Sequence, residues 1–198
     1  MKDWTGNKTT TWATLGASNH SDYERAEHDF YATDSRAIDE LFKVIEKPTE
    51  VWECACGAGH LSKRMEELGV KVYSTDLIDH DYGTPGIDFL ATDTLVAPVI
   101  ITNPPYRYAL EFVEHAIELG AERVCMFLKL TFLEGVKRQR LFQKYPPHTV
   151  AVFTKRIQVA RNGDPEMFKK SSAACYAWFI WDKGYTGAPK ITWINKGE

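Results

Sequence analysis

The stretch that decides the fold spans residues 51–76 and reads VWECACGAGHLSKRMEELGVKVYSTD. It begins with an apolar segment at 51–55, passes through a turn containing two glycines into a helical pattern at 60–68, and returns to an apolar segment at 70–75. Apolar strands that alternate with helices bury both of their faces by forming a mostly parallel sheet covered by helices. The stretch therefore predicts one strand–helix–strand unit of an open α/β sheet.

The same alternation continues on both sides of this unit. The pattern predicts helices at 36–47 and 109–119 and strands at 99–102 and 123–128. Two further apolar strands at 149–154 and 173–181 have no helical pattern between them, so we expect an antiparallel pair at the sheet edge. The predicted fold class is α/β: a Rossmann-like domain with a mostly parallel central sheet, helices on both faces and an antiparallel edge hairpin.

Length and composition set the organisation of the domain. The chain has 198 residues, of which 44% are hydrophobic and 26% charged, as in an ordinary soluble globular protein. Residues 1–28 are rich in Thr, Asn, Ser and Gly, so we expect a flexible arm before a single domain at 29–198. The longest apolar run, 173–181, is shorter than the ~18 residues of a spanning helix, and no signal-peptide core is visible, which favours a cytoplasmic location.

The four cysteines do not predict a metal site. Cys54 and Cys56 lack the spacing of zinc ligands and have no matching Cys or His pair nearby. Cys54, Cys125 and Cys175 fall in segments that look like buried strands, which is typical of reduced core thiols. We therefore expect no metal.

The net charge of −3 conceals an uneven distribution. Residues 129–170 contain ten Lys or Arg and three Asp or Glu, so this segment is near +7 and the remainder near −10. A basic face on an acidic body favours a polyanionic partner such as nucleic acid, although solvated helix faces often have the same composition.

The glycine turn after the first strand predicts a cofactor pocket. Gly57 and Gly59 stand where the strand ends and the helix begins, and such a turn lets a ligand approach the backbone and the helix N-terminus. Asp76 ends the next strand nineteen residues beyond Gly57, where an acidic residue accepts hydrogen bonds from ribose hydroxyls. The pair favours an adenosine-type cofactor. NAD remains an alternative, although Ser62 stands where a dinucleotide fingerprint has glycine or alanine.

The turn at 103–106 is the strongest functional signal. Asn103, Pro104, Pro105 and Tyr106 follow directly on an apolar strand, and the prolines hold the turn extended and rigid. The Asn103 side-chain oxygen and the Pro104 carbonyl can accept both hydrogens of a planar amino group, while Tyr106 can stack on its ring. Drawing the nitrogen toward tetrahedral geometry localises its lone pair, which is what attack on a methyl donor requires. The turn predicts methyl transfer to an amino nitrogen.

With these two turns and the acid at 76, the sequence resembles the S-adenosylmethionine-dependent amino-methyltransferases. Members of this class methylate adenine or cytosine amino groups in DNA, and relatives act on ribosomal RNA and protein glutamine. The resemblance covers about 29–182 and implies the class I methyltransferase fold with S-adenosylmethionine as the cofactor. It is most similar, through 132–135, Arg138, 155–156 and 176–179, to small enzymes of phages and mobile elements. It implies cofactor contacts at Phe30, Tyr31, Thr33, Glu53, Cys56, Gly57, Gly59, Asp76 and Leu77. Asp88 and Phe89 follow the third expected strand region and can supply a polar and an aromatic contact to an adenine ring, with simple core packing an equal alternative for Phe89.

Members of this class that recognise long DNA sites usually carry a separate target-recognition domain, and none is expected in this chain. We predict phosphate contacts from the basic segment, at Lys137, Arg138, Arg140, Arg156, Arg161, Lys169 and Lys170. The predicted activity is methylation of an exocyclic amino group, with adenine N6 in DNA the most favoured acceptor. Ribosomal RNA or protein glutamine is the first alternative, and a catalytically silent cofactor-binding subunit the second.

Overall fold

The computed structural model describes residues 31–161 and 174–195. Its elements in chain order are β1 (Tyr31–Thr33), α2 (Arg36–Leu41), β2 (Glu50–Glu53), α3 (His60–Glu67), β3 (Lys71–Ser74), η2 (Phe89–Ala91), β4 (Val99–Thr102), η3 (Tyr106–Tyr108), α4 (Ala109–Glu118), β5 (Arg123–Lys129), η4 (Leu130–Leu133), α5 (Val136–Lys144), β6 (Thr149–Phe153), β7 (Val159–Arg161), β8 (Tyr176–Asp182) and β9 (Lys190–Ile194).

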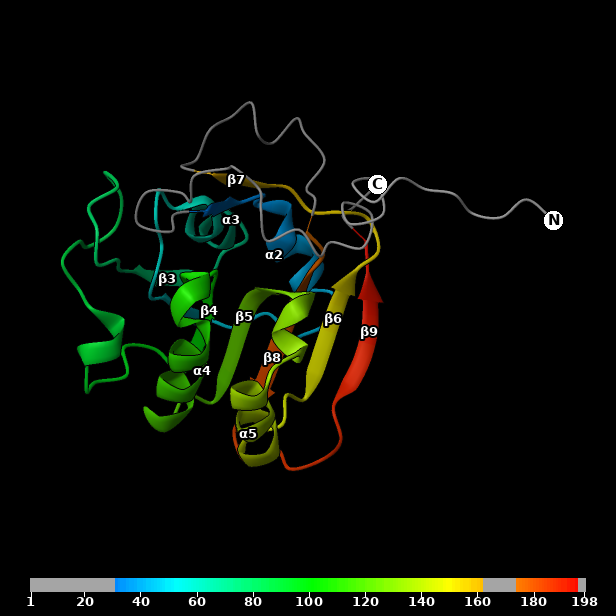
Figure 1. Ribbon diagram of the computed structural model, residues 1–198. Helices are drawn as coiled ribbons and strands as arrows, with labels where there is room; N and C mark the ends of the chain where they lie inside the picture. Colours follow the sequence, from blue (N-terminus) through cyan, green and yellow to red (C-terminus); the bar gives the residue numbers. More distant parts are fainter. Residues whose placement is uncertain (1–30, 162–173, 196–198) are drawn as a thin grey trace, which may run out of the picture.

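A seven-stranded sheet in the order β3-β2-β4-β5-β8-β6-β9 forms the centre of the molecule (Figure 1). All neighbouring strands pair in parallel except β8, which is antiparallel to both β5 and β6. The predicted α/β fold with a mostly parallel sheet is thereby confirmed, and β6 and β8 are the predicted antiparallel pair. β9 lies outside this pair as a further strand that the sequence analysis did not predict.

The two faces of the sheet follow from the alternation of side chains along each strand. In β5, Val124, Met126 and Leu128 face one core, and Cys125 and Phe127 face the other. Helices α4 and α5 cover the first face and α2 and α3 the second, as predicted for helices on both sides (Figure 1). The central strands β2, β4, β5 and β8 are therefore buried on both faces, which explains their near-continuous apolar sequences.

Cys175 is a correction to the sequence analysis. The apolar pattern places it inside a buried strand, but it is exposed because β8 begins one residue later, at Tyr176. The other cysteines are buried, as expected of core thiols.

Helix α2 is shorter than the predicted span of 36–47. After Leu41 the chain tightens, since the amides of Lys43 and Val44 bond to the carbonyls of Glu40 and Leu41 three residues back. Ile45 nevertheless stays buried in the core, so the apolar spacing that suggested a longer helix reflects packing of these turns rather than a continued helix.

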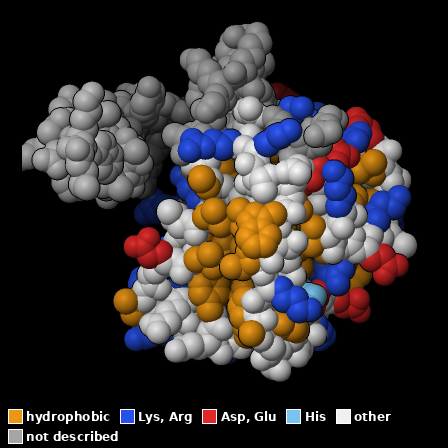
Figure 2. All heavy atoms as spheres, turned by 90° about the vertical axis from the view of Figure 1, so that its right-hand side faces the viewer, with side chains coloured by type: hydrophobic (Ala, Val, Ile, Leu, Met, Phe, Trp, Pro, Cys, Tyr) orange, Lys and Arg blue, Asp and Glu red, His pale blue; other side chains and the backbone are white. Residues whose placement is uncertain are grey.

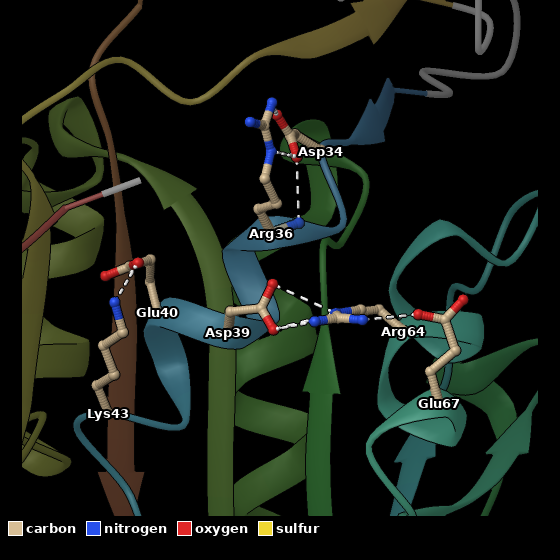
Figure 3. Close-up of polar contacts among 7 residues, drawn as sticks. All are labelled: Asp34, Arg36, Asp39, Glu40, Lys43, Arg64 and Glu67. Atoms are coloured by element: carbon tan, nitrogen blue, oxygen red, sulfur yellow. Dashed lines mark hydrogen bonds and ion pairs between the residues drawn. The ribbon is translucent and has the colours of Figure 1, made fainter. Parts of the chain in front are cut away.

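Polar contacts join α2 to α3 on this face of the sheet (Figure 3). Arg64 of α3 binds Asp39 of α2 at 2.6 Å and Glu67 of its own helix at 2.8 Å. On α2 itself, the nearly buried Glu40 pairs with Lys43 at 2.6 Å. These contacts hold the helix that follows the glycine turn against the rest of the domain.

A small second sheet, β1 with β7, positions the segment that precedes α2. The two strands are antiparallel, with Thr33 opposite Val159, and the Asp34 amide bonds to the Gln158 carbonyl at 3.1 Å. This pairing places Thr33 beside the end of β4, where it reaches the turn at 103–106.

An apolar patch lies on the outer side of β9, and Figure 2 shows it as a cluster of hydrophobic side chains on that face of the molecule. Ile191 and Trp193 are 58% and 69% exposed and stand beside Val150 and Val152 of β6, on the face that α5 covers further inward. Among the described residues no helix is both long and apolar enough to cross a bilayer.

Candidate active site

One cavity of about 690 Å³ lies at the carboxyl ends of β2, β3 and β4. Ligands bind at this end of the strands in doubly wound sheets. The cavity brings the glycine turn, the acid after β3 and the turn at 103–106 together. Its lining is Ala32, Thr33, Glu53, Cys54, Ala55, Cys56, His60, Leu61, Asp76, Leu77, Ile78, His80, Ile87, Asp88, Phe89, Leu90, Asn103, Pro104, Pro105, Arg107, Tyr108 and Phe112.

Asp76 is fixed to the glycine turn by hydrogen bonds. The Gly57 amide donates to Asp76 Oδ2 at 2.8 Å, and the Ile78 amide donates to Oδ1 at 2.9 Å. A carboxylate oxygen accepts more than one hydrogen bond, so each oxygen can still accept one from a ligand hydroxyl. The predicted pairing of the glycine turn with this acid is thus a direct contact, and it sets the carboxylate at the cavity wall.

Gly59 begins α3 in the left-handed conformation, with φ of 77°. A Cβ at this position would lie 2.4 Å from ring carbons of Tyr82, so the Tyr82 ring packs directly on the glycine. Lys63 Nζ lies 4.7 Å from the centre of the same ring. The sequence analysis missed Tyr82, because its contact with Gly59 arises only when residues 79–86 fold back over the glycine turn.

Glu53 lies beneath the cavity as a buried acid. It is 2% exposed, its Oε2 accepts a hydrogen bond from the Ser62 hydroxyl, and Ser62 in turn lies 2.6 Å from the Ser74 hydroxyl. Burial raises the pKa of Glu53 to about 8, against the opposing effect of the Ser62 hydrogen bonds. Glu53 is therefore mainly protonated at neutral pH, and a neutral carboxyl can donate as well as accept.

Cys56 lines the cavity as an unreactive thiol. Burial and the nearby Glu53 and Asp76 carboxyls raise its pKa to about 12. Because the thiolate is the nucleophilic form, this environment excludes Cys56 as a nucleophile near neutral pH. Its Sγ instead contacts the carbonyls of Gly57 and Tyr82 at 3.6 and 3.8 Å, and so joins the glycine turn to the loop above it.

The Asn103 side chain is oriented by a residue from a distant part of the chain. Its Nδ2 donates to Thr33 Oγ1 at 2.9 Å, and Thr33 is only 2% exposed. Because the amide nitrogen of Asn103 binds Thr33, its amide oxygen points away from Thr33. Asn103 and both following prolines line the cavity, and the prolines contribute no amide hydrogens that would compete for acceptors. Thr33 is a predicted cofactor contact, and it lines the cavity as well as holding Asn103.

Tyr106, which was predicted to stack on the acceptor ring, is not among the residues that line the cavity and packs against the core instead. It is half-buried, its ring centre is 4.9 Å from Lys129 Nζ, and the Tyr176 ring lies 6.1 Å away with a tilt of 32°. The two residues that follow it, Arg107 and Tyr108, do line the cavity, with the guanidinium 5.4 Å from the Tyr108 ring. The sequence analysis missed Lys129, Arg107 and Tyr108 as site residues.

The remaining predicted cofactor residues occupy the wall opposite the turn. Leu77 is 57% exposed at the cavity, and Asp88 accepts a hydrogen bond from the Leu90 amide at 3.0 Å. Phe89 is 1% exposed and packs edge-on against Trp52 at 5.2 Å, so it forms the cavity floor as part of the core. Tyr31 is placed by its backbone in β1, and Phe30 lies outside the described residues.

The predicted phosphate-binding residues are spread over two elements. Lys137 and Arg140 are exposed on α5, and Arg156 is exposed after β6. Arg138 is engaged locally, since its guanidinium donates to the Glu134 carbonyl and lies 5.3 Å from the Phe132 ring. Arg161 is placed by its backbone in β7, while Lys169 and Lys170 lie outside the described residues.

Comparison with known proteins identifies the fold. Neither a protein-family model nor a curated relative matches the sequence. Among solved structures, a candidate class I S-adenosylmethionine-dependent methyltransferase from Listeria monocytogenes is similar with a TM-score of 0.55 at 15% identity, covering 95% of this chain and 71% of that one. A candidate RNA methyltransferase from Pyrococcus horikoshii is similar with a TM-score of 0.58 at 14% identity, covering 90% and 99%.

A third similar structure is the methyltransferase subunit of a type I restriction-modification system from Streptococcus thermophilus. Its TM-score is 0.56 at 12% identity, and the match covers 84% of this chain and 48% of that one. This chain thus spans about half the length of that subunit. Together with the strand order described above, these similarities identify the Rossmann-like α/β fold of class I methyltransferases.

Proposed function

We propose that the protein is an S-adenosylmethionine-dependent methyltransferase that methylates an exocyclic amino group, with adenine N6 in DNA as its acceptor. The observation that carries this proposal is the shared cavity: Asn103, Pro104 and Asp76 line the same space, and Asp76 is hydrogen-bonded to Gly57 of the glycine turn. A methyl group passes directly between two molecules only when both are held within contact distance.

The cavity fits the proposed cofactor. Its volume of about 690 Å³ is within the range of small-molecule sites. Asp76 presents carboxylate oxygens for ribose hydroxyls, the apolar Leu77 and Ile78 follow it along the wall, and Phe89 closes the floor. When bound, S-adenosylmethionine would supply a sulfonium methyl group for direct displacement by the amino nitrogen, with the carbon–sulfur electron pair going to sulfur and one of the two nitrogen hydrogens leaving as a proton to solvent.

The chain's own residues prepare the amino group. The Asn103 amide oxygen and the Pro104 carbonyl accept one amino hydrogen each, which draws the nitrogen out of conjugation and localises its lone pair. Positive charge grows on this nitrogen as the bond forms, so the same two acceptors bind it more strongly in the transition state than before. In this proposal the Thr33 hydroxyl holds the Asn103 amide through its Nδ2 and so leaves the amide oxygen, which is buried, for the amino group.

Nucleic acid is favoured over protein as the acceptor by the distribution of charge. Lys137, Arg140 and Arg156 are exposed in the basic segment, and Arg107 lines the cavity itself. Two similar structures carry names that include nucleic-acid modification, an RNA methyltransferase and a restriction-modification subunit. In duplex DNA the target base must leave the stack to reach the turn, because its amino group is otherwise inside the helix.

The experiment offers labelled S-adenosylmethionine with pools of DNA, RNA and protein. We expect label in adenine of DNA, and its loss in Asn103→Ala, with folding of the variant checked by circular dichroism. Label in RNA or in protein glutamine would instead establish the alternative acceptors. If the wild type binds the cofactor but labels no pool, a catalytically silent subunit is the correct description. A parallel titration with NAD tests the alternative that the pocket binds a dinucleotide.

A further inference from the structure

We propose that Lys129 binds a phosphate of the target nucleotide, beside Tyr106 of the turn and outside the set of residues that line the cofactor cavity. This inference rests on the proposed function and deepens it, because it names the class of acceptor that the same site takes. It assigns the role to a residue outside the predicted phosphate contacts.

The position of Lys129 follows from the sheet register. β4 and β5 are parallel neighbours with Thr102 opposite Met126, so Asn103 and Lys129 both lie at the carboxyl end of the sheet. Lys129 ends β5 and is paired with Tyr176 of β8. Its Nζ lies 4.9 Å from the centre of the Tyr106 ring. Tyr176 is 6% exposed and stacks on Phe127 at 4.9 Å, so it belongs to the core, and Lys129 and Tyr106 are the cation and the ring beside the proposed catalytic turn.

Lys129 has no acidic side chain beside it among the described residues. Within the described part of the chain, no Asp or Glu oxygen lies within 4.0 Å of its Nζ, whereas Lys43 and Lys144 bind Glu40 and Glu118 at 2.6 and 3.6 Å. Lys129 is half-buried, so it has lost part of its hydration. The contact with the Tyr106 ring compensates for part of this loss. A phosphate beside the ammonium would supply the opposite charge that the described residues do not.

The combination of groups distinguishes a nucleotide from a protein amide. A nucleotide carries a flat ring and an anion a fixed number of bonds apart, which matches an aromatic side chain with an ammonium beside it. A glutamine side chain has neither a ring nor a charge. Arg107 lines the cofactor cavity and contacts the ring of Tyr108, whereas Lys129 contacts the ring of Tyr106. Lys129 is therefore the cation that the acceptor side presents.

The test compares Lys129→Gln, Lys129→Arg and Lys71→Gln. Lys71 is a matched control, because its Nζ lies 4.7 Å from the Tyr73 ring but at the amino end of β3, away from the turn. Binding of an adenine-containing DNA duplex is measured by fluorescence anisotropy from 50 to 200 mM salt, alongside the affinity for S-adenosylmethionine and steady-state methylation.

For Lys129→Gln we expect weaker DNA binding, a higher KM with kcat less affected, and a salt-dependence slope smaller by about 0.9, the loss of one phosphate contact. Cofactor affinity stays unchanged. Lys129→Arg restores the slope, and Lys71→Gln behaves as wild type. A folded Lys129→Gln with an unchanged slope overturns the inference even if its affinity falls, since that is the signature of a merely structural residue. It leaves the proposed function standing, whereas a wild type that methylates no nucleic acid removes both.

Discussion

Substitution of Gly59 by alanine tests whether the Tyr82 ring packs on the glycine turn beside the cofactor cavity. An alanine there must keep a φ of 77° and place its Cβ 2.4 Å from the Tyr82 ring. The left-handed backbone costs about 1–2 kcal/mol for a residue with a Cβ. Overpacking against a ring costs about 1–3 kcal/mol more. We expect Gly59→Ala to lower the free energy of unfolding by about 2–5 kcal/mol, and to weaken cofactor binding because Tyr82 is pushed off the glycine turn.

Gly69 supplies the matched control for this experiment. It has a φ of 82°, and a Cβ at this position would meet no atom within 4 Å, so Gly69→Ala carries the backbone cost alone. Urea unfolding gives the stabilities, and calorimetric titration gives the affinity for S-adenosylmethionine. Adding Tyr82→Ala to Gly59→Ala should recover the overpacking part of the loss but not the backbone part. Equal losses in the two glycine variants, or no recovery in the double variant, would refute the packing of Tyr82 on Gly59.

Three further results are expected. Glu53 has a folded pKa of about 8 against about 4.3 in an unfolded chain, so between these values the folded state holds a proton that the unfolded state has lost. The free energy of unfolding should therefore fall as pH rises from 5 to 8, by up to about 1.4 kcal/mol per pH unit. Urea unfolding should show no such pH dependence for Glu53→Gln, and equal pH profiles of the variant and the wild type would contradict the raised pKa. Thr33→Val removes the bond that orients Asn103, so the single-turnover rate of methyl transfer at saturating cofactor should fall by about tenfold or more. An unchanged rate would remove Thr33 from the positioning of Asn103. Of the four cysteines only the exposed Cys175 should react quickly with an aromatic disulfide reagent at pH 8, with the other three reacting after denaturation; fast reaction at Cys56 would contradict its buried, protonated state.

Much of the fold follows from local patterns in the sequence. The strands that border the cavity are apolar on both faces and end at glycine, acid or proline, so their limits were predictable to within one or two residues. β9 was missed because it lacks the apolar run of the central strands: only Ile194 is buried, and Ile191 and Trp193 face solvent. The length of α2 was overestimated because Ile45 is held in the core by tightened turns that have nearly helical spacing.

The candidate site was predictable where its residues follow one another in the chain and not where they meet in space. The glycine turn, Asp76 and the turn at 103–106 can each be recognised from neighbouring residues alone. The bond from Asn103 to Thr33 joins residues that are far apart in sequence, and the packing of Tyr82 on Gly59 depends on how an irregular loop folds back. Lys129 is one of ten Lys or Arg in the segment 129–170, and only its contact with Tyr106 distinguishes it from the others.

The most direct test of the central claim separates the two sides of the cavity. Cofactor affinity by calorimetry and single-turnover methyl transfer are measured for Asp76→Ala and Asn103→Ala in parallel. Asp76→Ala should weaken S-adenosylmethionine binding by about tenfold or more, the equivalent of about 1.4 kcal/mol. Asn103→Ala should keep that affinity and lower the transfer rate by about 100-fold or more. Full transfer activity in Asn103→Ala, or cofactor binding that Asp76→Ala leaves intact, would contradict the account.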